Sequence, residues 1–176
     1  MVRDMDKRKT ASDVAYMGLF LTLALILSYV ESLIPFNFGV PGIKLGLANL
    51  CVVILLYISG WREALCVDLL RVILSGFIFG NMSMIIYSLA GAFLSFICMV
   101  IVHKMNRFSP MGVSLTGGVT HNIGQLTVAM LALGTSRIIY YVPVLILSGA
   151  LTGALLGFIA GMVIRRIERY TCTHIS

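Results

Sequence analysis

Six long apolar runs, joined by short polar or basic connections, restrict what this chain can fold into more than any other feature. The runs lie at residues 11–34, 43–59, 64–79, 83–102, 112–133 and 138–164, and the second is short. A helix needs about 20 apolar residues to cross about 30 Å of hydrocarbon. The chain is 59% hydrophobic and 11% charged, whereas soluble domains carry about 25% charged residues. We therefore predict an all-α integral membrane protein, a single transmembrane domain over residues 1–176 with short tails at 1–10 and 167–176.

Basic residues lie almost entirely in alternate connections, and this pattern predicts the orientation of the spans. Ten of them flank the first, second, fourth and sixth runs on one side: Arg3, Lys7, Arg8, Lys9, Arg62, Lys104, Arg107, Arg165, Arg166 and Arg169. Only Lys44 and Arg137 lie on the opposite side. Because basic residues flank spans on the cytoplasmic side, we predict a six-helix bundle in the plasma membrane with both termini cytoplasmic. The same rule explains the net charge of +6 without a nucleic-acid partner.

One acidic and one basic residue lie inside the third run. Asp68 and Arg71 are three residues apart, so they share one face of a helix. Each alone would cost roughly 2.5–3.5 kcal/mol at mid-membrane on insertion scales. One interpretation is a self-compensating pair that turns this helix toward the bundle interior. The other is that Arg71 also binds an anionic group of a ligand, with Asp68 orienting the guanidinium.

The fifth run contains three polar side chains within less than two helical turns: His121, Asn122 and Gln125. Buried groups of this kind need hydrogen-bond partners. They either bond to neighbouring helices or line a site, and two glycines one turn earlier leave room beside them. We predict that this stretch forms one wall of a ligand cavity, with Arg71 opposite or adjacent.

Two further polar residues are candidates for the same site. Glu31 lies near the outer end of the first run, where it either pairs with Lys44 or sits at the water interface. Asn49 lies deeper in the second run. A buried asparagine needs partners, and a hydrogen bond between helices is its simplest role.

Small residues recur at helical spacing in the last run and at the start of the first. In the last run they are Gly149, Gly153, Gly157 and Gly161. A face without side chains lets another helix approach closely, so we predict a helix-packing seam; a homodimer face or a sliding interface is the alternative. The first run begins with Ala11, Ala15 and Gly18, a face suited either to internal packing or to a partner protein.

Several catalytic motifs are missing from the sequence. It contains no acidic pair of the D-D-x-x-D type, no G-x-x-x-x-G-K-[ST] phosphate loop, and neither H-E-x-x-H nor G-x-S-x-G. These motifs supply metal ligands, phosphate-binding amides and nucleophiles. We therefore expect no metal site, no cofactor and no catalysis by the chain alone. Two functions are then left for the chain: a binding or transport subunit, or a membrane anchor for a catalytic partner.

Five segments together carry a family resemblance. They are "IKLGLANL" (43–50), "LLRVILSGFIFG" (69–80), "YSLAGAFLS" (87–95), "THNIGQLTVA" (120–129) and "YVPVLILSGALTGALLGF" (141–158). The chain resembles the bacterial membrane family of Gx transporters, also called heptaprenyl diphosphate synthase component I. The resemblance extends over about residues 15–166.

This family is similar to the substrate-binding S components of energy-coupling-factor transporters, which have six helices and cytoplasmic termini. The resemblance implies a small vitamin-, flavin- or quinone-related solute, a membrane coupling subunit and two ATPases. It also implies that an A-x-x-x-A face, here Ala11 and Ala15, docks the coupling subunit. S components for nickel and cobalt begin with Met-His, whereas this chain begins with Met1 and Val2, so a metal substrate is not expected.

The family's names imply two other roles. The synthase name implies an accessory subunit of a polyprenyl diphosphate synthase, because this sequence lacks the acidic motifs that would hold magnesium. The association of relatives with flavin-based extracellular electron transfer implies a membrane subunit of a redox system.

Overall fold

Six α-helices and one short 3₁₀ helix make up the residues that the computed structural model describes, which are 11–33, 46–134 and 136–174. In chain order they are α1 (Ala11–Leu33), α2 (Asn49–Ile58), α3 (Trp61–Phe79), α4 (Met82–Lys104), α5 (Pro110–Leu133), η1 (Ser136–Tyr141) and α6 (Val142–His174). No strand occurs among the described residues. The all-α class predicted from the apolar runs is therefore confirmed for this part of the chain.

Side-chain caps and glycines set the boundaries of the longer helices. Asn81 accepts a hydrogen bond from the Met84 N–H at 2.9 Å and caps α4. Ser109 caps α5, and a proline occupies the first position of that helix. Both are favoured ways to begin a helix, because they satisfy or remove N–H groups that have no partner within it. Gly134 ends α5 in the left-handed region, at φ +59°, which glycine adopts without strain.

The second helix is much shorter than the run at 43–59 predicted. Residues 43–45 lie outside the described part of the chain, and α2 begins only at Asn49, after a turn in which Gly46 has φ +82°. Its 10 residues extend about 15 Å. Residues 51–56 are all buried, as expected of a helix that is apolar on every side.

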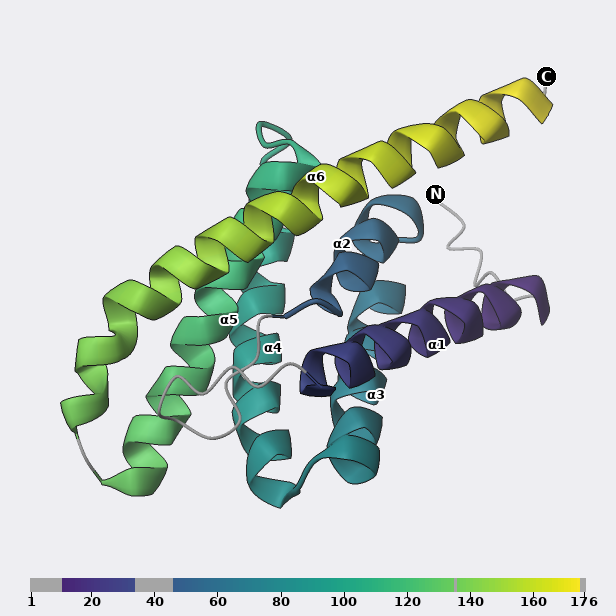
Figure 1. Ribbon diagram of the computed structural model, residues 1–176. Coiled ribbons are helices and arrows are strands. Elements are labelled where there is room, and N and C mark those ends of the chain that lie inside the picture. Colours follow the sequence, from purple (N-terminus) through teal and green to yellow (C-terminus); the bar gives the residue numbers. More distant parts are fainter. Residues whose placement is uncertain (1–10, 34–45, 135, 175–176) are drawn as a thin grey trace, which may run out of the picture.

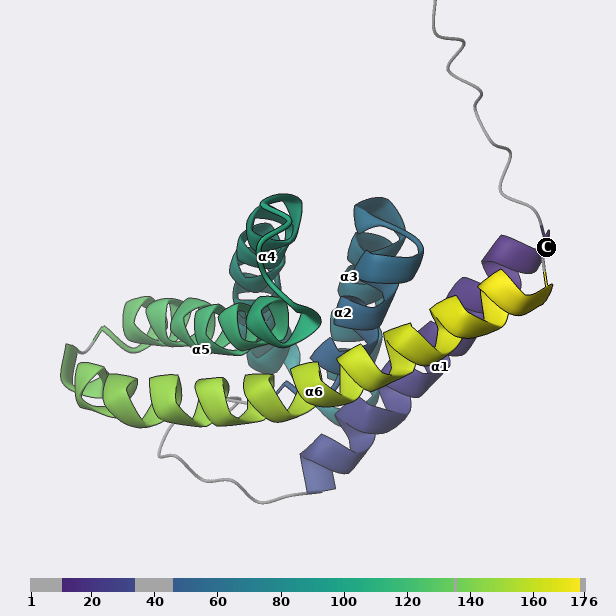
Figure 2. The ribbon, with the colours of Figure 1, turned by 90° about the horizontal axis from the view of Figure 1, so that it is seen from above.

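The short helix lies among its neighbours, and the longer helices surround it. Helix α2 packs against α1, α3, α5 and α6, while α5 packs between α4 and α6. Helices α5 and α6 run side by side in both views (Figures 1 and 2). The first turn of α1 and the last turn of α6 point toward the same side of the molecule. Termini on one side of the membrane, as the basic residues predict, require this arrangement.

The last helix continues well beyond its predicted end at residue 164. It has 33 residues and reaches His174, which corresponds to about 50 Å of helix. Its C-terminal turns project past the other helices (Figure 1). The segment expected to be a short tail from 167 is therefore helical up to residue 174.

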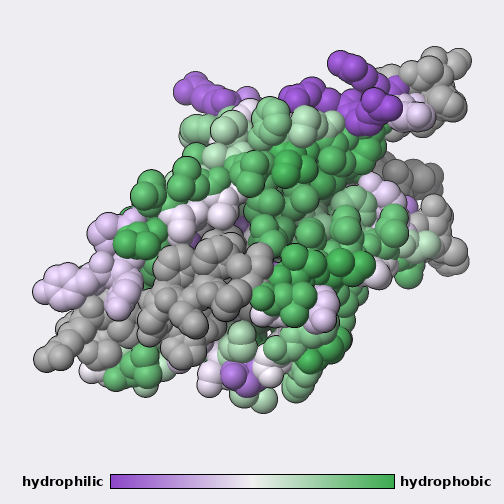
Figure 3. Space-filling view, viewed as in Figure 1, coloured by the Kyte–Doolittle hydropathy of each residue, from purple (hydrophilic) through white to green (hydrophobic). Residues whose placement is uncertain are grey.

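Length and surface composition indicate a membrane protein. Among the described residues, three helices are long and apolar enough to cross a membrane: Asp13–Leu33, Met82–Lys104 and Ile139–Tyr170. Helices α3 and α5 have 19 and 24 residues, but they carry buried charged or polar side chains. Hydrophobic residues cover most of the visible face, and several of the most hydrophilic side chains stand along its upper edge, toward the end of α6 (Figure 3). The count of six spans and the side of the termini stay predictions.

Single cysteines introduced into a variant without native cysteines test that topology. A membrane-impermeant thiol reagent added outside should label Gly39→Cys and Ser136→Cys, because both follow odd-numbered predicted spans. It should not reach Arg8→Cys, Asn106→Cys or Arg169→Cys until the membrane is permeabilised. Labelling of Asn106→Cys in intact cells would contradict the predicted orientation.

Candidate functional site

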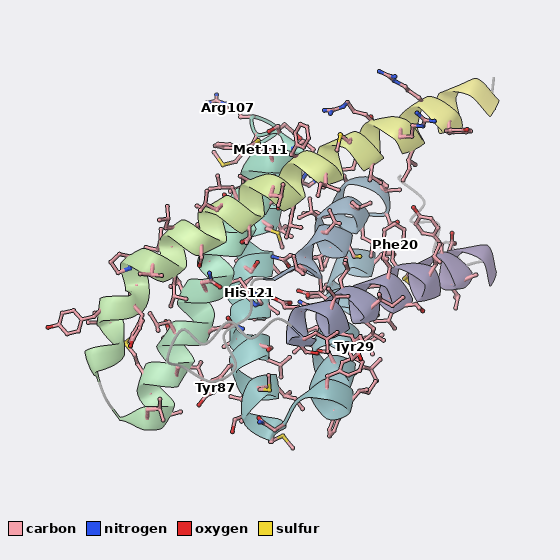
Figure 4. The ribbon with its side chains drawn as sticks, in the orientation of Figure 1. Phe20, Tyr29, Tyr87, Arg107, Met111 and His121 are labelled. Atoms are coloured by element: carbon pink, nitrogen blue, oxygen red, sulfur yellow. The ribbon has the colours of Figure 1, made fainter. Side chains whose placement is uncertain are left out.

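The interior of the bundle is apolar toward one end. We call this the basic end: the end that holds the α2–α3 and α4–α5 turns, with Arg62 and Arg107 beside them, and the C-terminal part of α6 (Figure 4). All six α-helices contribute buried apolar side chains to one cluster there. Its members include Phe20, Ala24, residues 51–56, Ala64, Val67, Phe96, Met99, Val113, Ala160 and Ile164.

Farther from the basic end, helices α1 to α5 bury polar side chains instead. These residues, here called the polar layer, are Ser28, Glu31, Asn49, Asp68, Arg71, Ser75, Ser88, Ser95, His121 and Gln125, each at most 5% exposed. Within each of the five helices they lie on the far side of the apolar cluster. Beyond the layer, Leu126, Ala129 and Leu145 form a second apolar cluster between α5 and α6. The layer therefore collects polar groups from five helices in one half of the bundle.

Asp68 and Arg71 form a buried ion pair within α3. The Arg71 Nε and Nη2 atoms donate to the same carboxylate oxygen, Asp68 Oδ1, at 3.2 and 2.5 Å. The pair thus has the spacing expected of residues three apart. Nη1 of Arg71 donates to no residue within the described part of the chain. This guanidinium therefore retains hydrogen-bond donors after its charge is compensated.

The three polar residues of α5 point in two directions. His121 and Gln125 face α4: a Cβ on Gly91 would lie 3.1 Å from His121 Cε1 and 2.7 Å from Gln125 Cγ. Asn122 faces α6, where its Nδ2 donates to the Leu145 carbonyl at 2.9 Å. Successive helical residues are about 100° apart, whereas residues four apart share a face. The structure therefore buries His121 (Figure 4) and Gln125 on the side of α5 that faces α4, and it places Asn122 in the α5–α6 contact.

Glu31 joins the end of α1 to the start of α2. Its Oε1 accepts a hydrogen bond from the Gly46 N–H at 2.5 Å, and the Gly46 carbonyl accepts one from the Asn49 N–H at 2.9 Å. Glu31 and Asn49 therefore both bond to the backbone of Gly46. Lys44, the partner proposed for Glu31, lies outside the described residues.

Four side-chain oxygens of the polar layer have no hydrogen-bond partner among the residues that the structure describes. They are Ser28 Oγ, Asn49 Oδ1, Ser88 Oγ and Ser95 Oγ. A buried polar atom without a partner costs about 1–3 kcal/mol, so a ligand or water at these atoms would be favourable. The three serines were not predicted, because serine in a helix usually bonds to its own backbone, as Ser75 Oγ does to the Val72 carbonyl.

The glycines of α6 lie against α5. A Cβ on Gly149 would lie 2.7 Å from the Gly118 carbonyl oxygen, and one on Gly153 would lie 2.7 Å from that of Ser114. One on Gly157 would lie 2.5 Å from the Met111 Cα. Gly161 differs, because its nearest atom would be 3.6 Å away, on the flexible Arg165 side chain. Gly149, Gly153 and Gly157 therefore allow α6 to lie close to the α5 backbone. Helix α5 thus covers the face of α6 for which a homodimer contact was the alternative interpretation.

The small residues of α1 lie on the outside of this helix. Ala15 and Gly18 are exposed, and a Cβ on Gly18 would meet no atom within 4 Å. The side chain of Ala11 lies outside the described residues. Nothing in the described part of this chain packs on the Gly18 position, which leaves the face free for lipid or another protein.

Within the described residues, no group of three or more His, Cys, Asp and Glu side chains is placed to hold a metal ion. The polar layer instead offers hydrogen-bonding groups from several helices.

Comparison with known protein families matches residues 20–163 to the heptaprenyl diphosphate synthase component I family. Searches among curated proteins and among solved structures find no match. The matched range contains the entire polar layer and the glycines that hold α6 against α5. It confirms the resemblance carried by the five sequence segments, and the chain belongs to the heptaprenyl diphosphate synthase component I family.

Proposed function

We propose that this chain is the substrate-binding membrane subunit of a transporter of the energy-coupling-factor type, for a small vitamin-, flavin- or quinone-related solute. The observation that carries the proposal is the polar layer, to which five helices contribute residues that are at most 5% exposed. Polar and ionisable side chains inside a membrane protein are expensive, and they characteristically mark substrate pathways and binding sites.

The distribution of the layer also supports a solute-binding role. Most buried polar groups lie away from the basic end, whereas the interior at the basic end is apolar among the described residues except for Ser114. If the basic end is cytoplasmic, as the charge pattern predicts, the polar half lies toward the outside. A solute that enters from outside would then bind in this half, and the apolar cluster would close the route to the cytoplasm.

The exposed face of α1 supports a partner within the same proposal. Ala15 and Gly18 present almost no side-chain volume on the outside of this helix. Close approach of a second membrane helix needs such a face. We propose that a membrane coupling subunit docks there and that two ATPases drive the cycle, so that this chain itself catalyses no reaction.

The family name favours a second candidate function. Heptaprenyl diphosphate synthase component I suggests an accessory membrane component that works with a synthase. In that role the chain would anchor or regulate a catalytic partner. The polar layer would then support the reaction of this partner and would not bind a transported solute.

Gentle purification followed by mass spectrometry separates the two candidates. The transport proposal expects a bound small solute, together with a coupling subunit and ATPases. In the accessory role a synthase copurifies instead, without a solute, and that result would reject the transport proposal.

Variants of the layer then test whether the solute binds there. Gln125→Leu and His121→Leu should reduce the amount of bound solute, because each removes a buried hydrogen-bonding side chain of the layer, and the thermal unfolding temperature shows whether each variant still folds. Thr127→Val is the matched control, since Thr127 is an exposed residue of the same helix. If the two variants instead lower the unfolding temperature and retain the solute, these residues only pack the bundle.

A further inference from the structure

The polar layer contains few charges, and they nearly cancel. Among the described residues its ionised groups are the carboxylates of Glu31 and Asp68 and the guanidinium of Arg71. The two negative charges and one positive charge of these groups sum to −1. Lys44, which lies outside the described residues, would bring the sum to zero if it joined the layer. Neither count leaves a surplus of positive charge.

We propose that the ligand of this layer carries no net charge, and that the layer excludes phosphates and diphosphates. The inference rests on the proposed binding function and narrows its substrate class. Sites for phosphate normally combine several cationic or N–H donors, often with a bidentate arginine. Here the one described arginine of the layer already shares its charge with Asp68. A multiply charged anion would be buried without compensation, beside carboxylates of the same sign.

The hydrogen-bonding atoms of the layer that have no described partner favour a neutral or zwitterionic ligand. Arg71 Nη1 offers donors, whereas Asn49 Oδ1 is an acceptor. The hydroxyls of Ser28, Ser88 and Ser95 can each donate and accept. Such a mixture suits a molecule that combines carbonyl, amide, ring-nitrogen or hydroxyl groups. It gives no reason for a ligand to carry a charged phosphoryl group.

The inference also constrains the accessory role. A chain that assists a prenyl diphosphate synthase could be expected to hold the diphosphate of its substrate. The polar layer has no surplus of positive charge, so we do not expect it to bind this diphosphate. If the accessory function is correct, the diphosphate must be bound by the partner.

Inorganic pyrophosphate is a direct probe, because it supplies the excluded charge without requiring the natural ligand. We compare the purified wild-type protein with Glu31→Gln and Asp68→Asn by titration calorimetry and thermal unfolding, at constant ionic strength. Each variant removes one carboxylate charge from the layer. Glu31→Gln keeps a side-chain oxygen that can accept from the Gly46 N–H, so it should fold even if Asp68→Asn does not. Glu63→Gln makes the same charge change in the first turn of α3, near the basic end and outside the layer.

Pyrophosphate should bind the wild-type protein and Glu63→Gln only weakly and should stabilise neither. It should bind at least about tenfold more tightly to Glu31→Gln, and to Asp68→Asn if that variant folds, which corresponds to about 1.4 kcal/mol or more. Binding of pyrophosphate to the wild-type protein that is as tight as, or tighter than, its binding to Glu31→Gln would overturn the proposal. Because no natural solute is required, this result is independent of whether a solute copurifies, which is the test of the transport function itself.

Discussion

Replacing Asp68 with leucine should destabilise the protein by about 3–5 kcal/mol, because it leaves the Arg71 guanidinium buried without a counter-charge. Arg71 is only 4% exposed, and all its hydrogen bonds to described residues go to Asp68. Unfolding of the purified protein in mixed micelles, followed by circular dichroism against increasing denaturing detergent, measures the change. Arg71→Leu should produce a loss of similar size for the converse reason.

The double variant Asp68→Leu with Arg71→Leu should lose clearly less than the sum of the two single losses. Removing both charges eliminates the uncompensated group that each single variant creates. Leu70→Ala is the control, since Leu70 lies between the two in sequence but is 42% exposed; it should change stability little. Strictly additive losses would show that the two charges are not coupled.

A leucine at Gly118 should lower stability by roughly 3 kcal/mol, at the upper end of the usual range for overpacking. Even a single Cβ at this position would lie 2.3 Å from the Gly149 carbonyl oxygen. The position of the Cβ is fixed by the α5 backbone, and the carbonyl oxygen belongs to the α6 backbone. Rotation of a side chain therefore cannot relieve the clash, and α5 must move away from α6. The same detergent titration measures this effect, and Gly118→Ala should show a smaller loss in the same direction.

Gly161→Ala provides the control on the other side of the same interface. Its Cβ would meet nothing closer than 3.6 Å, and alanine is favoured over glycine within a helix by up to about 1 kcal/mol. It should therefore be neutral or stabilising. If Gly118→Ala and Gly161→Ala were equally tolerated, close backbone contact would not be what holds α5 and α6 together.

Apolar run length predicts four of the helices well, and it fails for the other two for physical reasons. The runs at 11–34, 64–79, 83–102 and 112–133 agree with α1, α3, α4 and α5 to within about three residues. The start of α2 depends on the positive φ of Gly46, which no hydrophobic pattern reveals. The apolar run ends at residue 164, just before Arg165 and Arg166, but arginine is compatible with helix, and α6 continues to His174.

For the candidate site, sequence indicates which side chains are unusual but not what they face. Asp68 and Arg71 pair within one helix, so their spacing alone predicts the contact. Asn122 is adjacent to His121 in sequence, so the two side chains leave the helix about 100° apart. That Asn122 meets the Leu145 carbonyl depends on how α5 and α6 pack. Ser28, Ser88 and Ser95 gave no signal, because only burial distinguishes them from serines bonded to their own helix.

The length of α2 has a consequence for how the protein enters the membrane during synthesis. Ten residues cover about half of a hydrocarbon core of about 30 Å, so α2 cannot be recognised and released into lipid as a segment of its own. The next helix, α3, carries Asp68 and Arg71, which make its independent transfer unfavourable. Only the turn at Ser59 and Gly60 separates the two helices. We therefore expect the translocation machinery to retain α2 and α3 together until a later helix shields them, so that integration of this region is a late, cooperative event.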